Sequence, residues 1–193
     1  MFSIRRADRT DAGVLATLGE RLFRAAFGAS NTAEDMQLYV QSAFSPKRQA
    51  LELSSPLTST WLVEDEAGES IGYAMVKLGA PSHDIEARNP LEIVRFYVDA
   101  AWHGQGIAAA LMATCVDQAR EWGCDQLWLG VWDQNPRAIA FYKKSGFRIV
   151  GSQPFQLGAD RQRDFIMVRP AAGCRGAGSA SSRGSVAEGR RWR

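Results

Sequence analysis

The sequence is poor in the residues that build metal sites and disulfide frameworks. Its 193 residues include only three cysteines and two histidines. Cys115, Cys124 and Cys174 form no CxxC pair. Zinc sites use several Cys or His ligands at characteristic spacings, and small disulfide-stabilised secreted domains are dense in cysteine. We therefore expect neither a metal site nor a disulfide framework.

Long apolar runs are also missing. No stretch reaches the roughly 20 apolar residues that a membrane-spanning helix needs. The N-terminal MFSIRRADRTD has no apolar run after its basic residues, so it does not resemble a secretory signal. Together with the low cysteine content, these absences predict a cytoplasmic protein without a membrane partner.

Apolar periodicity is absent from the end of the chain, residues 171–193. This segment is rich in glycine, serine and alanine and has five arginines and one glutamate. Its charge of +4, taken from the +2 of the whole chain, leaves −2 on residues 1–170. We expect one domain over residues 1–170 and a disordered tail over 171–193, because such a composition cannot bury enough apolar surface to fold. The tail lacks interleaved aromatic residues, so nucleic acid is not an expected partner.

Within residues 1–170, apolar spacing predicts strands and helices in a mixed order. Capping residues support several helices, since Thr32, Ser45 and Asn135 each precede a helical pattern. The predicted strands lie at 2–7, at two places within 60–79, and at 91–99, 124–132, 147–152 and 163–169. The predicted helices lie at 11–27, 33–44, from 46, at 106–123 and at 136–145. This order indicates an α/β fold with a mixed, partly antiparallel sheet.

The stretch AWHGQGIAAA, residues 101–110, places two glycines between a strand and a helix. A helix N-terminus has free N–H groups, and glycines let an anion such as a phosphate approach them. A P-loop is excluded because no Lys-Ser/Thr follows the glycines. A dinucleotide fingerprint remains an alternative: Gly104, Gly106 and Ala109 fit G-x-G-x-x-A, and Asp125 follows at about the right distance. A turn that only packs the helix on the sheet is a third interpretation.

Two motifs resemble those of the GNAT N-acetyltransferases. HGQGIA, residues 103–108, is similar to their pyrophosphate loop, with His103 in place of the usual Arg or Gln. WLGVWDQNPRAIAFYKKSGFRIVG, residues 128–151, matches their strand, Asn-initiated helix with a tyrosine, and Gly-Phe. The segment NTAEDMQLYVQSAF and the end of the domain further resemble the PaiA-like spermidine/spermine N-acetyltransferases, at Gly151, Ser152, Phe155, Leu157, Gly158, Asp160, Gln162, Asp164 and Met167. The resemblance covers nearly all of residues 1–170.

This resemblance implies the GNAT fold: a mixed, largely antiparallel central sheet with a splayed parallel pair, here 91–99 and 124–132, flanked by helices. It also implies acetyl-CoA as the cosubstrate. The backbone of Phe96, Tyr97 and Val98 would pair with the pantetheine arm. The pyrophosphate would bind at His103, Gly104, Gln105, Gly106, Ile107 and Ala108. Asn135 would contact the cofactor arm, although its place before Pro136 also suits a helix cap that needs no function.

Two side chains are candidates for the chemistry. The helical position of Tyr142 differs from those of Ile139 and Phe141, so Tyr142 need not be core, and its phenol can protonate the leaving thiolate as a general acid. Glu92 is the candidate general base, because the family often has an acidic residue at the start of this strand. The PaiA-like pattern has a second glutamate two residues later, where this chain has Val94.

The implied activity is acetyl transfer to a primary amine of a small molecule, with a polyamine expected, by direct attack in a ternary complex. Scattered acidic residues could attract a polycation: Glu34, Asp35, Asp84, Glu86 and Asp133. The alternatives are an amine of a protein N-terminus, an amino acid or an antibiotic, and a non-catalytic acetyl-CoA-binding regulator. A homodimer is a further expectation from the resemblance. Cys115 is interpreted as core rather than as a nucleophile.

Overall fold

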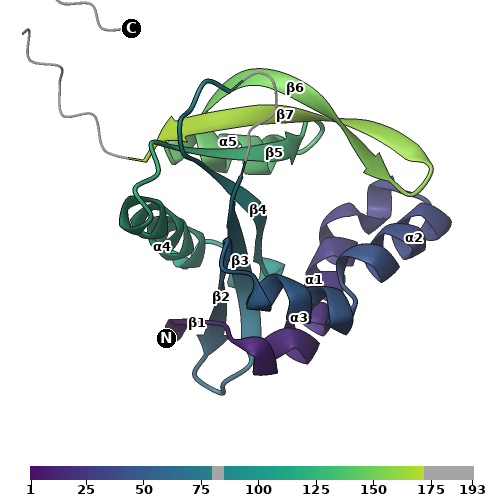
Figure 1. The fold of residues 1–193 in the computed structure, drawn as a ribbon. Coiled ribbons are helices and arrows are strands. Elements are labelled where there is room, and N and C mark those ends of the chain that lie inside the picture. The colour runs from purple at the N-terminus through teal and green to yellow at the C-terminus, as the bar shows by residue number, and fades with distance from the viewer. Residues whose placement is uncertain (80–84, 172–193) are drawn as a thin grey trace, which may run out of the picture.

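A single mixed sheet of seven strands runs through the computed structural model, which describes residues 1–79 and 85–171 (Figure 1). The strands are β1 (Phe2–Arg6), β2 (Thr58–Asp65), β3 (Ser70–Leu78), β4 (Pro90–Val98), β5 (Gln126–Trp132), β6 (Arg148–Leu157) and β7 (Asp160–Pro170). The helices are α1 (Ala12–Phe27), α2 (Ala33–Ala43), α3 (Pro46–Ser54), α4 (Ile107–Glu121) and α5 (Pro136–Lys144), with short 3-10 turns at Arg9–Asp11, Gly28–Ser30 and Ala100–Trp102. The predicted tail and Asp84 lie outside the described residues.

The strand order is β1-β2-β3-β4-β5-β7-β6, and every neighbouring pair is antiparallel except β4 and β5. That parallel pair is short, because its register runs only from Pro90 opposite Gln126 to Glu92 opposite Trp128. Beyond Glu92, β4 stays paired with β3 as far as Val98, while β5 pairs with β7. The two strands therefore separate, and the predicted fold with its splayed parallel pair is confirmed.

A β-bulge interrupts β4 just where the separation begins. Met75 pairs with Arg95 and Val76 pairs with Ile93, so Val94 is the extra residue. A bulge shifts the alternation of side chains by one. Leu91 and Ile93 before the bulge and Phe96 after it consequently contact the same core.

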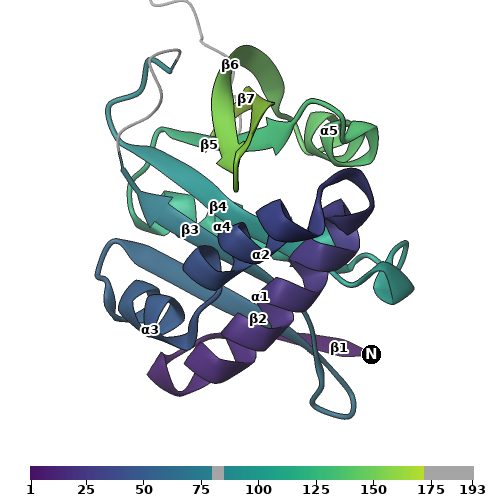
Figure 2. The same cartoon turned by 90° about the vertical axis from the view of Figure 1, so that its right-hand side faces the viewer.

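The helices divide between the two faces of the sheet (Figures 1 and 2). The largest apolar core lies between the sheet and the two helices α4 and α5, and it includes the fully buried Leu111, Cys115 and Leu127. Cys115 is thus core, as predicted, and burial raises the pKa of its thiol to about 12. On the other face, α1 packs on the sheet through Leu15, Leu18 and Leu22.

Three predicted helix starts are confirmed by their caps. The side chains of Thr32, Ser45 and Asn135 accept N–H bonds from Asp35, Arg48 and Ala138 respectively. Pro46 and Pro136 follow at the first helical position, where a proline ring fits without loss of a hydrogen bond. Among the described residues, no helix is both long enough and apolar enough to cross a membrane.

The last two strands are longer than the sequence predicts. The sequence predicts these strands at 147–152 and 163–169, but β6 extends to Leu157 and β7 begins at Asp160. The two strands form a hairpin that reaches α2 (Figure 2). Half of the side chains of β6 are exposed and only Leu157 is buried, so the strand has little apolar alternation. Leu157 at the tip is fully buried in a cluster with residues of α1 and α2. The extension is therefore stabilised by tertiary packing that strand periodicity cannot reveal.

Candidate active site

The glycine turn lies between β4 and α4 and is open to solvent. Gly104 and Gly106 both have φ of +82°, in the left-handed region that glycine adopts without strain. A Cβ added at either position would meet no atom within 4 Å, and residues 103–106 are exposed. The backbone can thus be approached closely from outside.

The N-terminus of α4 follows directly and has no side-chain cap. Its N-cap residue is Gly106, and the first helical bond runs from the N–H of Ala110 to the carbonyl of Gly106. The N–H groups of residues 107–109 have no side-chain acceptor within the described residues. A free helix start behind an open glycine turn has the charge and the access that a phosphate requires.

The dinucleotide alternative is not supported by the position of Asp125. This residue precedes β5, and because β4 and β5 are parallel it lies at the edge of the sheet opposite the glycine turn. Its carboxylate accepts the N–H groups of Arg88 and Asn89 at 2.8 and 3.1 Å. These bonds also hold its pKa below the usual range. Asp125 is a structural link between β5 and the segment before β4.

His103 connects three parts of the site. Its Nε2 lies 2.9 Å from the carbonyl oxygen of Val98, and its Nδ1 lies 2.5 Å from the guanidinium of Arg137. The same guanidinium nitrogen also lies 2.6 Å from Nε2, so Arg137 lies against both ring nitrogens. Arg137, in the first turn of α5, therefore brings a positive charge to a loop whose usual Arg or Gln is missing. Sequence reasoning missed Arg137 because the contact joins residues 34 positions apart.

The separated part of β4 has an unpaired side. Residues 93–98 pair with β3 but not with β5. Phe96 contacts the core on the α5 side, whereas Tyr97 contacts the clusters under α1 and α2. This geometry leaves backbone N–H and C=O groups along one side of the strand without a strand partner. Pairing with a pantetheine arm through Phe96, Tyr97 and Val98 stays a prediction, and the Val98 carbonyl already accepts from His103.

Tyr142 lies in the core, although its helical position alone did not require it. Its side chain is 8% exposed and its ring lies 6.2 Å from Phe96, 5.4 Å from Phe141 and 5.8 Å from Phe147. α5 therefore turns this position inward, onto the separated part of β4. The hydroxyl makes no hydrogen bond within the described residues. Burial raises its pKa, so the phenol is protonated at neutral pH.

Asn135 functions as the cap of α5. Its Oδ1 accepts the N–H of Ala138 at 3.1 Å, which satisfies one free donor of the helix start. The cap leaves the side-chain amide without a hydrogen bond inside the described residues. A contact from Asn135 to the cofactor arm stays a prediction.

Glu92 lies at the point where β4 and β5 part. It is opposite Lys77 on one side and Trp128 on the other, and it is half-buried. Burial raises the pKa of its carboxyl group, and the charge of Lys77 opposes that rise. Val94, where the resembling proteins have a second acid, is the bulge residue.

The other acidic candidates do not form one cluster. Asp133 pairs with Arg163 at 2.7 Å, and Asp35 accepts the N–H of Ala159 at 2.5 Å in the β6–β7 turn. Glu34 and Glu86 are exposed. Two of these carboxylates are thus occupied by partners of the chain itself.

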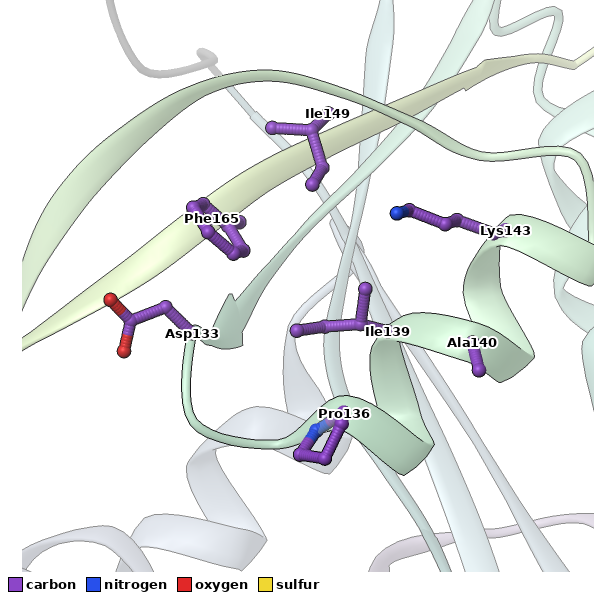
Figure 3. Close-up of a pocket in the computed structure, with 7 residues that line it drawn as sticks. All are labelled: Asp133, Pro136, Ile139, Ala140, Lys143, Ile149 and Phe165. Carbon is purple, nitrogen blue, oxygen red and sulfur yellow. The ribbon is translucent and has the colours of Figure 1, made fainter.

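A shallow hollow of about 490 Å³ lies between α5 and the last two strands (Figure 3). It is lined by Asp133, Pro136, Ile139, Ala140, Lys143, Ile149 and Phe165. None of these residues belongs to the glycine turn or to the separated part of β4. The hollow is therefore a surface distinct from the site assembled above.

Comparison with known proteins agrees with this geometry. The model of the acetyltransferase (GNAT) family matches residues 20–147. The chain belongs to the GNAT family. It is 36% identical over 160 residues to an uncharacterised N-acetyltransferase of Mycobacterium tuberculosis. The aligned region covers 83% of this chain and 97% of that protein. The protein is therefore a GNAT N-acetyltransferase, a family that uses acetyl-CoA.

More distant likenesses concern particular acceptors. The spermine/spermidine N(1)-acetyltransferase of Bacillus subtilis is 27% identical over 90 residues, 46% of this chain and 59% of that protein. The structure of the PaiA N-acetyltransferase of Thermoplasma acidophilum in complex with coenzyme A superposes with a TM-score of 0.71 at 18% identity, covering 88% of this chain and 99% of that one. At this identity the second likeness shows the fold alone.

Proposed function

We propose that this GNAT protein acetylates a primary amine of a small cationic molecule, a polyamine, directly from acetyl-CoA in a ternary complex. One observation carries the proposal: the opening between β4 and β5 can be reached from both faces of the sheet. The α4/α5 face has the open glycine turn and Tyr142, and the face under α1 and α2 has a different lining. The two substrates can then meet at the opening from opposite faces.

The cofactor side fits a pyrophosphate. The residues that would hold it are those of the loop His103–Ala108, where a ligand can approach the glycines and the start of α4. Arg137 would add a cation beside the loop. Bound acetyl-CoA would supply the acetyl thioester, with its arm along the unpaired side of Phe96, Tyr97 and Val98.

Tyr142 is proposed as the general acid. Its hydroxyl is protonated and has no acceptor among the described residues, and its ring lies 6.2 Å from that of Phe96 on the separated part of β4. A proton held at this oxygen can pass to a departing thiolate. Glu92 is the base that the sequence predicts, and this role stays a prediction.

A polyamine is favoured over other amines by charge and by the Bacillus relative. Residues 1–170 have a net charge of −2, so the domain does not repel a polycation. The relative named for spermine and spermidine aligns over 46% of this chain. A protein N-terminus, an amino acid and an antibiotic are the alternatives that acceptor profiling would reveal.

The test is CoA release from acetyl-CoA with spermidine, spermine, lysine, a short peptide and an aminoglycoside. Spermidine or spermine is expected to give the highest kcat/KM. Turnover with another acceptor only would overturn the polyamine assignment and leave acetyl transfer in place.

The cofactor side is tested separately with Arg137→Met. We expect the acetyl-CoA Kd to rise about tenfold, as one charge-assisted phosphate contact is lost. Arg120→Met is the matched control, because Arg120 lies on the exposed side of α4 and pairs with Asp117. Equal Kd values for the two variants would remove Arg137 from the site.

A further inference from the structure

Asp164 is a buried carboxylate for which the described part of the chain offers no partner. Its side chain is 8% exposed, and within the described residues it makes no hydrogen bond and no ion pair. An unpaired charge in such a place is costly unless a ligand compensates it. Asp164 belongs to β7, so a rigid strand in the middle of the β5–β7–β6 part of the sheet holds it.

The carboxylate lies against the separated part of β5. A Cβ added to Gly130 would come within 3.0 Å of an Asp164 oxygen, so the missing side chain makes room for that oxygen. Gly130 is two residues beyond Trp128, where pairing with β4 ends. Asp164 therefore borders the opening between β4 and β5.

The side chain of Asp164 lies on the face of the sheet that α1 and α2 cover. Its cross-strand neighbours are Trp132 and Gln153, whose side chains lie on the same face of the sheet. The ring of Trp132 lies 6.0 Å from that of Phe27 at the end of α1. Asp164 is thus on the face opposite the one that α5 covers.

Aromatic residues lie on the same face of the sheet as Asp164. Tyr39 of α2 lies 5.4 Å from Phe155 and 4.6 Å from Phe23, ring centroid to ring centroid. Burial raises the pKa of Tyr39, and the negative charge of Asp164 adds to the rise, which places the two groups within electrostatic reach. A lone carboxylate among aromatic rings is suited to an ammonium ion, which both groups attract.

We propose that Asp164 receives the ammonium group of the acceptor and removes its proton, as the general base of the reaction. This inference rests on the proposed function. The proton leaves the ammonium nitrogen for the carboxylate and then passes to solvent. The nitrogen–carbon bond of the amide forms as the carbon–sulfur bond of the thioester breaks, and the thiolate takes the proton of Tyr142. The nitrogen then loses its second proton to solvent, and solvent returns a proton to Tyr142.

Glu92 is a weaker candidate for this role. It lies where β4 and β5 are still paired, and it has a cation, Lys77, directly opposite on β3. Asp164 lies where the strands have parted and has no cation opposite it. The missing second acid at Val94 is thereby compensated from another strand.

The protonation behaviour of Asp164 agrees with a base. Burial, together with the charge of Asp133, raises the pKa of its carboxyl group to about 6. A base with this pKa is ionised at pH 7 and holds a proton more readily than an ordinary aspartate. The groups that face it are Asp133, which is paired with Arg163, and the phenol of Tyr39.

The experiment compares kcat and KM for the best acceptor of the panel in the full-length wild type, Asp164→Asn, Glu92→Gln and Asp117→Asn, from pH 6 to pH 10. Asp117 is an exposed control on α4. We expect Asp164→Asn to lower kcat/KM for the amine by about 10²–10³-fold at pH 7. The deficit should shrink towards pH 10, where the amine loses its proton without help. The acetyl-CoA Kd should stay unchanged, and this readout shows that the variant is folded.

The outcomes separate the two proposals. A deficit in Asp164→Asn with an acceptor other than a polyamine supports Asp164 and overturns the polyamine assignment. Near-wild-type kcat/KM in Asp164→Asn, with a pH-dependent loss in Glu92→Gln, overturns the role of Asp164 and leaves the function. If no acceptor releases CoA, spermidine is titrated into the CoA-loaded wild type in a calorimeter. Absence of binding then overturns both the polyamine function and the role of Asp164.

Discussion

Replacing Asp164 by asparagine should make the protein more stable at neutral pH. The folded state holds this carboxylate buried and unpaired, with a pKa raised from 3.8 to about 6. One pKa unit corresponds to about 1.4 kcal/mol, so ionisation of Asp164 costs the folded state about 3 kcal/mol above pH 7. Asparagine has nearly the same shape and no charge. We therefore expect a gain of about 2–3 kcal/mol in the free energy of unfolding at pH 7.5.

The pH dependence has a defined sign. Because the folded-state pKa is raised, the folded wild type binds more protons than the unfolded chain between about pH 4 and pH 6. Wild-type stability therefore falls relative to the variant as pH rises through this window, and the difference is constant above about pH 7. Below pH 4 both side chains are neutral, and the two proteins should unfold alike.

Urea unfolding at several pH values measures this difference. The control is Asp11→Asn, since the pKa of Asp11 is lowered by its hydrogen bonds to Arg5. That variant should lose stability at pH 7.5, the opposite sign. If Asp164→Asn is no more stable than the wild type at pH 7.5, the carboxylate has a stabilising partner in the folded chain and the reasoning is refuted.

Three further variants test other parts of the structure. Tyr142→Phe should lower kcat about 10²-fold in the CoA-release assay and leave Tm nearly unchanged, because the hydroxyl has no partner in the described chain. Gly106→Ala should cost about 1–2 kcal/mol through its φ of +82° and weaken acetyl-CoA binding, whereas Gly13→Ala, in open space on α1, should do neither, as titration calorimetry and urea unfolding would show. Glu52→Ala should cost about 3–5 kcal/mol in urea unfolding, because it leaves the guanidinium of Arg95 buried without its carboxylate partner; a loss below 1 kcal/mol would contradict this.

The sequence predicted the local structure of the glycine turn and of the start of α5 well. The glycine turn and the Asn135 cap are local features, and their conformations follow from residue types a few positions apart. The strands around the opening have strong apolar patterns, so their positions along the chain were also predictable. The family resemblance then supplied the parallel, splayed arrangement of β4 and β5.

Contacts between elements distant in the sequence were predicted poorly, for physical reasons. Asp164 was visible only as a matching position, because its burial depends on Gly130 and on α2, which are distant in the sequence. The burial of Tyr142 could not be predicted, because helical spacing gives relative directions but not which direction faces the sheet. The Arg137–His103 contact joins the start of α5 to the glycine turn, and no local pattern indicates it.

The short pairing of β4 with β5 has a consequence for the order of events. Only three residue pairs join β4 to β5, and beyond them the opening between these strands leads to both faces of the sheet. A nucleotide arriving from the α4/α5 side and an amine arriving from the α1/α2 side would follow paths that do not cross. Neither would have to wait for the other, so the kinetics should show random addition. Changes in α2 or the hairpin could then alter the preferred amine while the affinity for the nucleotide is retained.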